Sequence, residues 1–199
     1  MSLLAQLTRK VQTARLTGET RTAYAEGRIP DALIHARALY DFDMDNPWAN
    51  FLLACHHLEG DRYADALPHL TRLAEDWPTD AWTWYALGVC HDRLNCPSAA
   101  IPAYQEALSL APDWAKALKN MGRDLYLCGE YAAAEAALSR FSEMCPDDKE
   151  AHDLLGYLCY RQGRYACSFG HYEYARRLDP FNRKLERNAR LLYTRSATS

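Results

Sequence analysis

The sequence lacks any long apolar run: no stretch of 18 apolar residues occurs among its 199 residues, so no transmembrane helix is expected. Residues 1–10 contain three leucines but no continuous apolar stretch before a small-residue cleavage site, and we expect no secretory signal. Glycine-rich phosphate loops are also missing, because nothing resembles Gly-x-x-x-x-Gly-Lys or Gly-x-Gly-x-x-Gly. These absences argue against a membrane-spanning protein and against a nucleotide-binding enzyme.

A strong charge of one sign is missing as well. The net charge is −3. Residues 1–30 carry five basic and two acidic groups (+3) and residues 176–199 carry seven and two (+5), which leaves −11 for residues 31–175. Because a polyanion would meet an acidic centre between basic ends, nucleic-acid binding is not expected. A weaker alternative is that the basic C-terminal segment contacts acidic lipid or nucleic acid in a salt-sensitive way.

Recognisable metal or nucleophile motifs are absent too. The seven cysteines are odd in number and irregularly spaced within apolar segments, which favours reduced, mostly buried thiols in a cytoplasmic protein over a disulfide framework. Cys55, His56, His57 and His91 lack a Cys-x-x-Cys or His-x-x-x-His pair, so neither a metal nor another cofactor is predicted. No Cys–His pair lies in a strand-turn context, and we expect no enzyme.

What the sequence does contain is a strict internal period. Prolines mark it without exception, at Pro78, Pro112, Pro146 and Pro180, each 34 positions from the next. Other landmarks keep the same register: glycines at Gly88, Gly122 and Gly156, small residues at Ala66, Ala100, Ala134 and Ser168, and large residues at Leu70, Tyr104, Leu138 and Tyr172. Equal spacing of this kind indicates a repeat architecture in which each unit packs on its neighbours.

The pattern resembles the tetratricopeptide repeat. The copy that fits best reads Trp84, Leu87, Gly88, Ala100, Tyr104, Ala107 and Pro112. The resemblance implies an all-α fold, a right-handed superhelical solenoid of helix pairs. We expect one domain over 1–199: an N-terminal helix with a degraded first copy (1–46), four repeats (47–80, 81–114, 115–148 and 149–182) and a capping helix (183–195).

Turn and capping residues support this division. Each repeat has two apolar stretches that meet near Gly60-Asp61, Leu94-Asn95, Gly129-Glu130 or Gly163-Arg164, and a glycine there indicates a helix stop. Asn46, Asp80, Asp113 and Asp148 are predicted N-caps. In the degraded copy the turn glycine, Gly27, remains, although the spacing to Pro47 looks stretched.

The resemblance also implies a binding surface. In this family the concave wall comes mainly from the first helix of each repeat, and matching positions here form a predicted peptide-binding groove. It begins aromatic and apolar, continues through a cationic cluster and ends on a tyrosine: Trp48, Phe51, Cys55, Trp82, Tyr85, Val89, Lys116, Lys119, Asn120, Arg123, Asp153 and Tyr157. Leu154 stands where the family's clamp for chaperone C-termini needs asparagine, so that ligand is not predicted.

The sequence therefore predicts a non-catalytic, cytoplasmic adaptor or chaperone-like module. Its groove suits a peptide segment of another protein that has apolar side chains and an acidic group. The alternative is a self-assembling scaffold that forms homo-oligomers through its ends or its convex face. For each aromatic residue in the groove, packing between neighbouring helices is an equally good explanation, and the cations also fit a solvated face.

Overall fold

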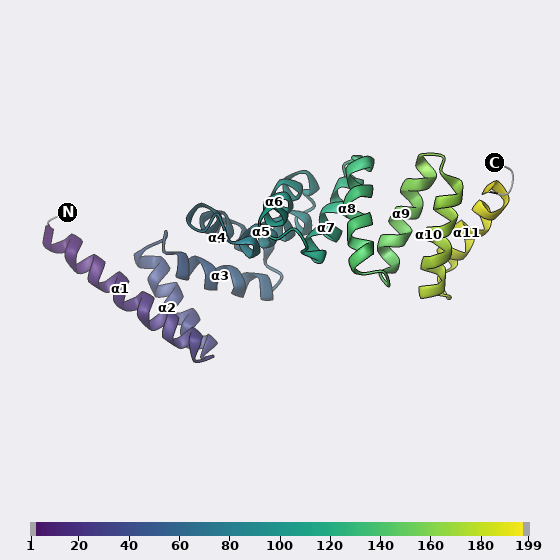
Figure 1. Ribbon diagram of the computed structural model, residues 1–199. Coiled ribbons are helices and arrows are strands. Elements are labelled where there is room, and N and C mark those ends of the chain that lie inside the picture. The colour runs from purple at the N-terminus through teal and green to yellow at the C-terminus, as the bar shows by residue number, and fades with distance from the viewer. Residues whose placement is uncertain (1–2, 197–199) are drawn as a thin grey trace. The chain divides into compact units, whose positions relative to one another are not determined.

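The computed structural model describes the backbone of residues 3–196 and the side chains of residues 6–190 and 192. Within that part the chain is all α-helical and contains no strand, as Figure 1 shows. It divides into two compact units, Met1–Cys96 and Pro97–Ser199. The boundary lies inside the predicted repeat 81–114, in the turn between its two helices. None of the described helices is both long and apolar enough to cross a lipid bilayer.

The unit Met1–Cys96 contains α1 (Leu3–Ala25), α2 (Ile29–Phe42), α3 (Pro47–Glu59), α4 (Tyr63–Asp76) and α5 (Ala81–Arg93). The unit Pro97–Ser199 contains α6 (Pro97–Leu110), α7 (Ala115–Leu127), α8 (Tyr131–Met144), α9 (Lys149–Arg161), α10 (Tyr165–Leu178) and α11 (Arg183–Ser196). In each unit, every helix packs against the next one along the chain. From α2 onwards the helix starts recur with the same spacing as the prolines, so the helical pairs follow the sequence period.

The turn inside each pair contains one residue in the left-handed backbone region. These residues have φ between 54° and 82° and are Gly27, Asp61, Asn95, Gly129 and Gly163, each 34 positions from the next. The degraded first copy therefore keeps the full period, and the prediction of a stretched spacing was wrong. At the predicted join Gly60-Asp61, Asp61 is the left-handed residue and Gly60 has φ −92°.

Replacement of Asn95 by glycine is expected to raise the free energy of unfolding by roughly 0.5 kcal/mol, because glycine adopts positive φ without strain. Asn95→Ala should lower it by about 1 kcal/mol, since alanine has neither glycine's freedom nor asparagine's tolerance of this conformation. Thermal melting of both variants provides the measurement. Equal melting temperatures for the two would contradict the assigned turn.

Side-chain N-caps begin α3, α5 and α9, each the first helix of a repeat. The side chain of Asn46 accepts hydrogen bonds from the backbone of Trp48 and Ala49 at 3.1 and 3.4 Å. Asp80 accepts from Thr83 N, and Asp148 accepts from Ala151 N, both at 3.0 Å.

The predicted cap Asp113 was wrong, because the cap position of α7 falls on Trp114, which makes no side-chain cap bond. The position equivalent to Asp80 and Asp148 in this repeat is 114, and Asp113 lies one residue before it. Asp113 is instead an exposed side chain 3.7 Å from Arg140.

Small residues allow paired helices to approach closely in the second unit. A Cβ atom built on Gly122 of α7 would lie 2.7 Å from Cγ of Leu138 in α8, and one on Gly156 of α9 would lie 3.1 Å from the ring of Tyr172 in α10. Ser168 donates a hydrogen bond to the carbonyl of Gly156 at 2.7 Å. Gly122 and Gly156 therefore lie at contacts between paired helices, and Gly88 is buried as well.

Candidate functional site

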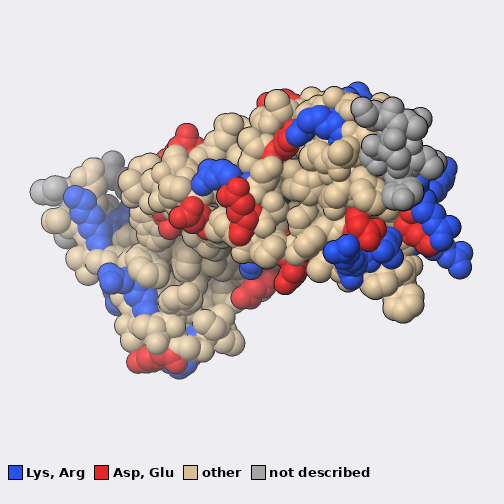
Figure 2. All heavy atoms as spheres, turned by 45° about the vertical axis from the view of Figure 1, so that its right-hand side comes forward, with Lys and Arg blue, Asp and Glu red and all other residues tan. Residues whose placement is uncertain are grey.

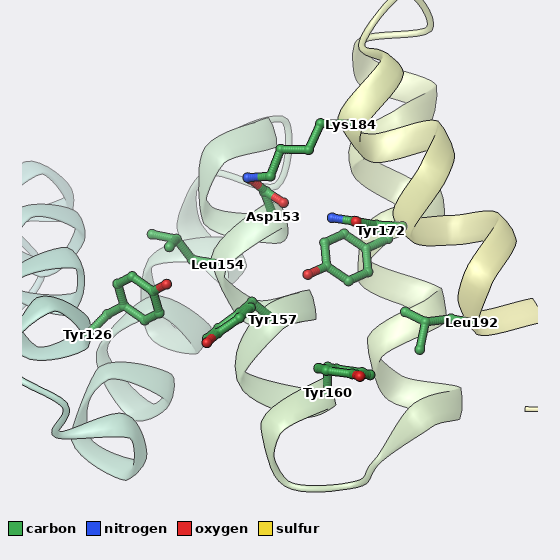
Figure 3. A pocket seen from close by; sticks show the side chains of 9 residues that line it. Tyr126, Asp153, Leu154, Tyr157, Tyr160, Tyr172, Lys184 and Leu192 are labelled. Atoms are coloured by element: carbon green, nitrogen blue, oxygen red, sulfur yellow. The ribbon is translucent and has the colours of Figure 1, made fainter. Parts of the chain in front are cut away.

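A cavity of about 400 Å³ opens in the unit Pro97–Ser199, where side chains of α7, α9, α10 and α11 meet (Figure 3). Its wall is mostly aromatic and apolar, with one ion pair and one amide at the side of α11. The lining residues are Tyr126, Asp153, Leu154, Tyr157, Tyr160, Tyr172, Lys184, Asn188 and Leu192. We call this the tyrosine cavity.

The repeat register explains which side chains reach the tyrosine cavity. Tyr126 from α7, four residues from α9 and two from α11 occupy the first-helix positions from which the sequence predicted a groove. Tyr172 comes from α10, and its ring reaches the wall across Gly156, which has no side chain in the way. Of the predicted groove residues, only Asp153 and Tyr157 line this cavity.

Aromatic contacts hold the wall in place. The rings of Tyr126 and Tyr157 meet edge to face with centroids 5.4 Å apart. Arg161 donates a hydrogen bond to the Tyr157 hydroxyl at 3.2 Å, and its guanidinium lies 5.2 Å from the ring centroid of Tyr131. Burial raises the pKa of Tyr172 and, together with Tyr157, the pKa of Tyr126. The hydroxyl groups of Tyr126 and Tyr172 are therefore neutral at neutral pH.

One ion pair forms an edge of the cavity. Lys184 of α11 extends towards Asp153 of α9, with Nζ 2.7 Å from the carboxylate oxygen (Figure 3). The side chain of Lys184 remains 70% exposed, whereas that of Asp153 is 24% exposed. Such a pair contributes little to stability, so its lysine can exchange partners with an incoming carboxylate at low cost.

The predicted cationic cluster on α7 is partly neutralised by the protein itself. Lys119 lies 2.8 Å from both Asp148 and Glu150; partial burial opposes its charge, but these carboxylates outweigh burial and raise its pKa. Asn120 donates to the hydroxyl of Tyr104 at 3.4 Å. Arg123 lies 3.8 Å from the buried Asp124, and Lys116 is exposed. On the face in Figure 2, basic and acidic side chains likewise lie beside one another.

The predicted aromatic residues of the first unit form a separate cluster. Phe51 lies 6.0 Å from Trp48, 6.2 Å from Trp77 and 5.6 Å from Trp82, measured between ring centroids. Trp48 also lies 6.4 Å from Tyr24. Each of these rings packs against Phe51, and all but Tyr24 are half-buried. This is the arrangement in which the aromatic residues fill gaps between helices, the alternative that the sequence left open. Tyr85 and Val89 of α5 are half-buried.

Two thiols and one disulfide stand out among the cysteines. Burial raises the pKa of Cys55 and of Cys90 to about 11, and Glu59 adds to the effect at Cys55. Both are therefore protonated and poorly nucleophilic at neutral pH. Cys159 and Cys167 form a disulfide between α9 and α10, with Cα atoms 6.0 Å apart. The expectation of reduced thiols was wrong for this pair, because the helix contact brings together two residues whose spacing matches no disulfide pattern.

Comparisons with known proteins agree with the repeat architecture. The family model described as tetratricopeptide repeat matches residues 51–115 and 120–183. Comparison with curated proteins finds no match.

Among solved structures, a MamA protein is 20% identical with a TM-score of 0.70, and the alignment covers 87% of this chain and 94% of that one. MamA from Desulfovibrio magneticus RS-1 is 14% identical with a TM-score of 0.67, covering 86% and 97%. YrrB, described as a TPR protein with an unusual peptide-binding site, is 17% identical with a TM-score of 0.73, covering 86% and 88%. These identities show a shared fold. Because the family model covers more than half of the residues, the chain belongs to the tetratricopeptide repeat family.

Proposed function

We propose that the protein is a non-catalytic interaction module that binds a peptide segment of a partner protein, with the tyrosine cavity as the anchoring site. The observation that carries this proposal is the cavity of about 400 Å³ on first-helix positions, lined by four tyrosines. Tyrosine supplies a large contact area at a low cost in side-chain entropy and is enriched at binding hot spots. Its proposed role is that of an adaptor or chaperone-like module in the cytoplasm.

The chemistry of the wall defines the ligand. Leu154, Leu192 and the tyrosine rings suit one apolar or aromatic side chain of the peptide. Lys184 and Asn188 lie on the α11 side and offer a cation and an amide to a neighbouring carboxylate. A peptide with an acidic residue close to a bulky apolar one therefore matches the cavity. Outside it, Lys116 on α7 and the aromatic cluster of Trp48, Phe51 and Trp82 stay predicted contacts.

Peptide display tests this proposal. Random peptides selected on the purified chain should be enriched in an acidic residue beside an aromatic or aliphatic one. In titration calorimetry with a selected peptide, Tyr157→Ala should weaken binding about 30-fold, which corresponds to roughly 2 kcal/mol for a hot-spot side chain. Tyr157→Phe should bind almost normally, because the ring and not its hydroxyl supplies the contact area.

Phe181 provides a matched control. Its side chain is 94% exposed in the loop before α11, in the same unit as the cavity, and lines no part of it. Phe181→Ala should therefore bind the peptide like the wild type. Circular dichroism must first show that every variant keeps its helices. Wild-type affinity in folded Tyr157→Ala would refute the cavity as the binding site.

The same exposed ring favours a second candidate function, a scaffold that self-associates. In this candidate function, Phe181, which is 94% exposed, is the contact that we assign to a second copy of the chain. Sedimentation velocity over a range of protein concentrations separates the candidates. Concentration-dependent association that Phe181→Ala abolishes and Tyr157→Ala leaves intact supports the scaffold.

A further inference from the structure

Two sulfur atoms and one imidazole come together at the contact between α9 and α10. The ligand atoms of Cys159, Cys167 and His171 all lie within 4.8 Å of one another, and among the described residues this is the only such group of three histidine, cysteine or acidic side chains. Cys167 and His171 are four residues apart on one face of α10, while Cys159 faces them from α9 and is 1% exposed. Three ligands from two packed helices form a compact donor set.

A second histidine orients the first. Nε2 of His152 lies 2.8 Å from the carbonyl oxygen of Pro146, and because a carbonyl only accepts, this nitrogen carries the proton. With the proton on Nε2, Nδ1 of His152 is the acceptor of its ring, and it lies 3.1 Å from Nδ1 of His171. His171 donates to it, which leaves Nε2 of His171 with a free lone pair. Imidazoles that bind metals are held by such outer hydrogen bonds.

This donor set has a preferred metal. Thiolate sulfur together with imidazole nitrogen selects soft or borderline ions, whereas magnesium and calcium prefer oxygen ligands. Zinc binds two cysteines and one histidine in known sites and takes water or a further side chain as its fourth ligand. A disulfide alone would need only the two cysteines, so it does not explain the ordered pair of histidines beside them.

We propose that Cys159, Cys167 and His171 bind Zn²⁺ when the Cys159–Cys167 disulfide is reduced, and that His152 acts as a positioning residue for His171. Two molecules of a thiol reductant cleave the S–S bond; they become one disulfide, and Cys159 and Cys167 become thiols. Zn²⁺ then replaces the two thiol protons, which pass to solvent, and forms two Zn–S bonds and one Zn–N bond. The oxidised chain has no free thiolate and lacks the site.

The proposed metal site also affects the tyrosine cavity, because it lies between two helices of the cavity wall. α9 supplies Tyr157 and Tyr160 to the cavity and α10 supplies Tyr172, so the site ties together two helices of its wall. Either the disulfide or the metal makes this link, and reduction without metal removes it. This consequence rests on the proposed function, but the metal site itself does not, because metal binding is measured without any peptide.

Cobalt, which replaces zinc and absorbs visible light, tests the site directly. The full chain is reduced with a phosphine, freed of metal and titrated with Co²⁺ under nitrogen. We expect one Co²⁺ per chain, with the intense near-ultraviolet absorption of Co–thiolate bonds, and displacement by Zn²⁺. Zn²⁺ should also raise the melting temperature of the reduced chain, because it binds the folded state. The oxidised chain should show no Co–thiolate absorption.

Matched variants separate this site from the other thiols. Cys159→Ser and Cys167→Ser should each lose the absorption, whereas Cys128→Ser, which removes an exposed free thiol of the same unit, should keep it. His152→Leu should weaken Co²⁺ binding about 10- to 100-fold at unchanged stoichiometry, and His152→Gln, whose amide oxygen accepts from His171, should recover part of the affinity. Absence of stoichiometric binding in the reduced wild type, or equal absorption in the folded double variant Cys159→Ser/Cys167→Ser, would overturn the proposal.

Discussion

Replacement of Gly122 by leucine is expected to destabilise the unit Pro97–Ser199 by about 3 kcal/mol, at the upper end of the range for overpacked cores. A Cβ atom at this position would lie 2.7 Å from Cγ of Leu138 and 3.4 Å from its backbone nitrogen. The side chain of Leu138 can rotate away, but the backbone of α8 cannot, so the two helices must separate. Denaturant unfolding of the variant and the wild type gives the difference in free energy.

Gly170 is the matched control for this substitution. It lies inside α10 of the same unit, is exposed, and has nothing within 4 Å of a built Cβ atom. Gly170→Leu should therefore stabilise the protein by roughly 0.5–1 kcal/mol, because leucine has the higher helix propensity. If both leucine variants shift the unfolding midpoint in the same direction, the close contact at Gly122 is not the cause.

Truncation of Leu138 to alanine should cost about 2–5 kcal/mol, the range for a buried leucine whose cavity closes only in part. Leu138 is 0% exposed and belongs to the core that Leu118, Phe141 and Leu155 share with it. The free energy of unfolding of Leu138→Ala, like that of the Gly122 variants, is measured by denaturant unfolding.

A double-mutant cycle tests whether Gly122 and Leu138 face each other. Gly122→Ala places a methyl group against Leu138 in the wild type, but in the Leu138→Ala background the same methyl group enters the cavity. The double variant should therefore be more stable than the two single effects predict, by on the order of 1 kcal/mol. Strictly additive effects would contradict the contact.

The sequence predicted the helices well because the same residue pattern recurs in several repeats. Errors occurred where one copy departs from the others by one position. Asp113 was predicted as a cap because it follows Pro112, yet the cap position falls on Trp114. The join near Gly60-Asp61 was predicted correctly, but the positive φ falls on Asp61, by register, and not on the glycine. In both cases the residue type gave a weaker signal than the place of the residue within the period.

The site was harder to predict for physical reasons. The register placed Asp153 and Tyr157 on the cavity wall, and continuing it into residues 183–195 would also have given Lys184 and Asn188. Tyr172 had no such signal, because its side chain reaches the wall only across Gly156. The ion pairs of Lys119 had no such signal either, since its partners Asp148 and Glu150 lie far along the sequence, where the next helix pair begins.

The cysteine and histidine cluster forms no recognisable sequence motif, because its members come from two helices. Cys159 and His152 lie seven residues apart on α9, and Cys167 and His171 lie four apart on α10. Only the antiparallel contact of these two helices brings the four side chains together. The pair Cys167 and His171, one helical turn apart, was the available signal.

The five left-handed turn residues lie 34 positions apart. A change in chain length therefore keeps the helices in register when it adds or removes 34 residues. An extra residue beside Gly129 would turn α8 by about 100° about its axis, given 3.6 residues per helical turn, and would move Ala134 and Leu138 away from α7. Loss of a whole segment such as 115–148 instead joins Trp114 to Lys149, two residues that already stand at equivalent boundaries. In-frame recombination between repeats is therefore a milder genetic event here than the insertion or deletion of a single codon.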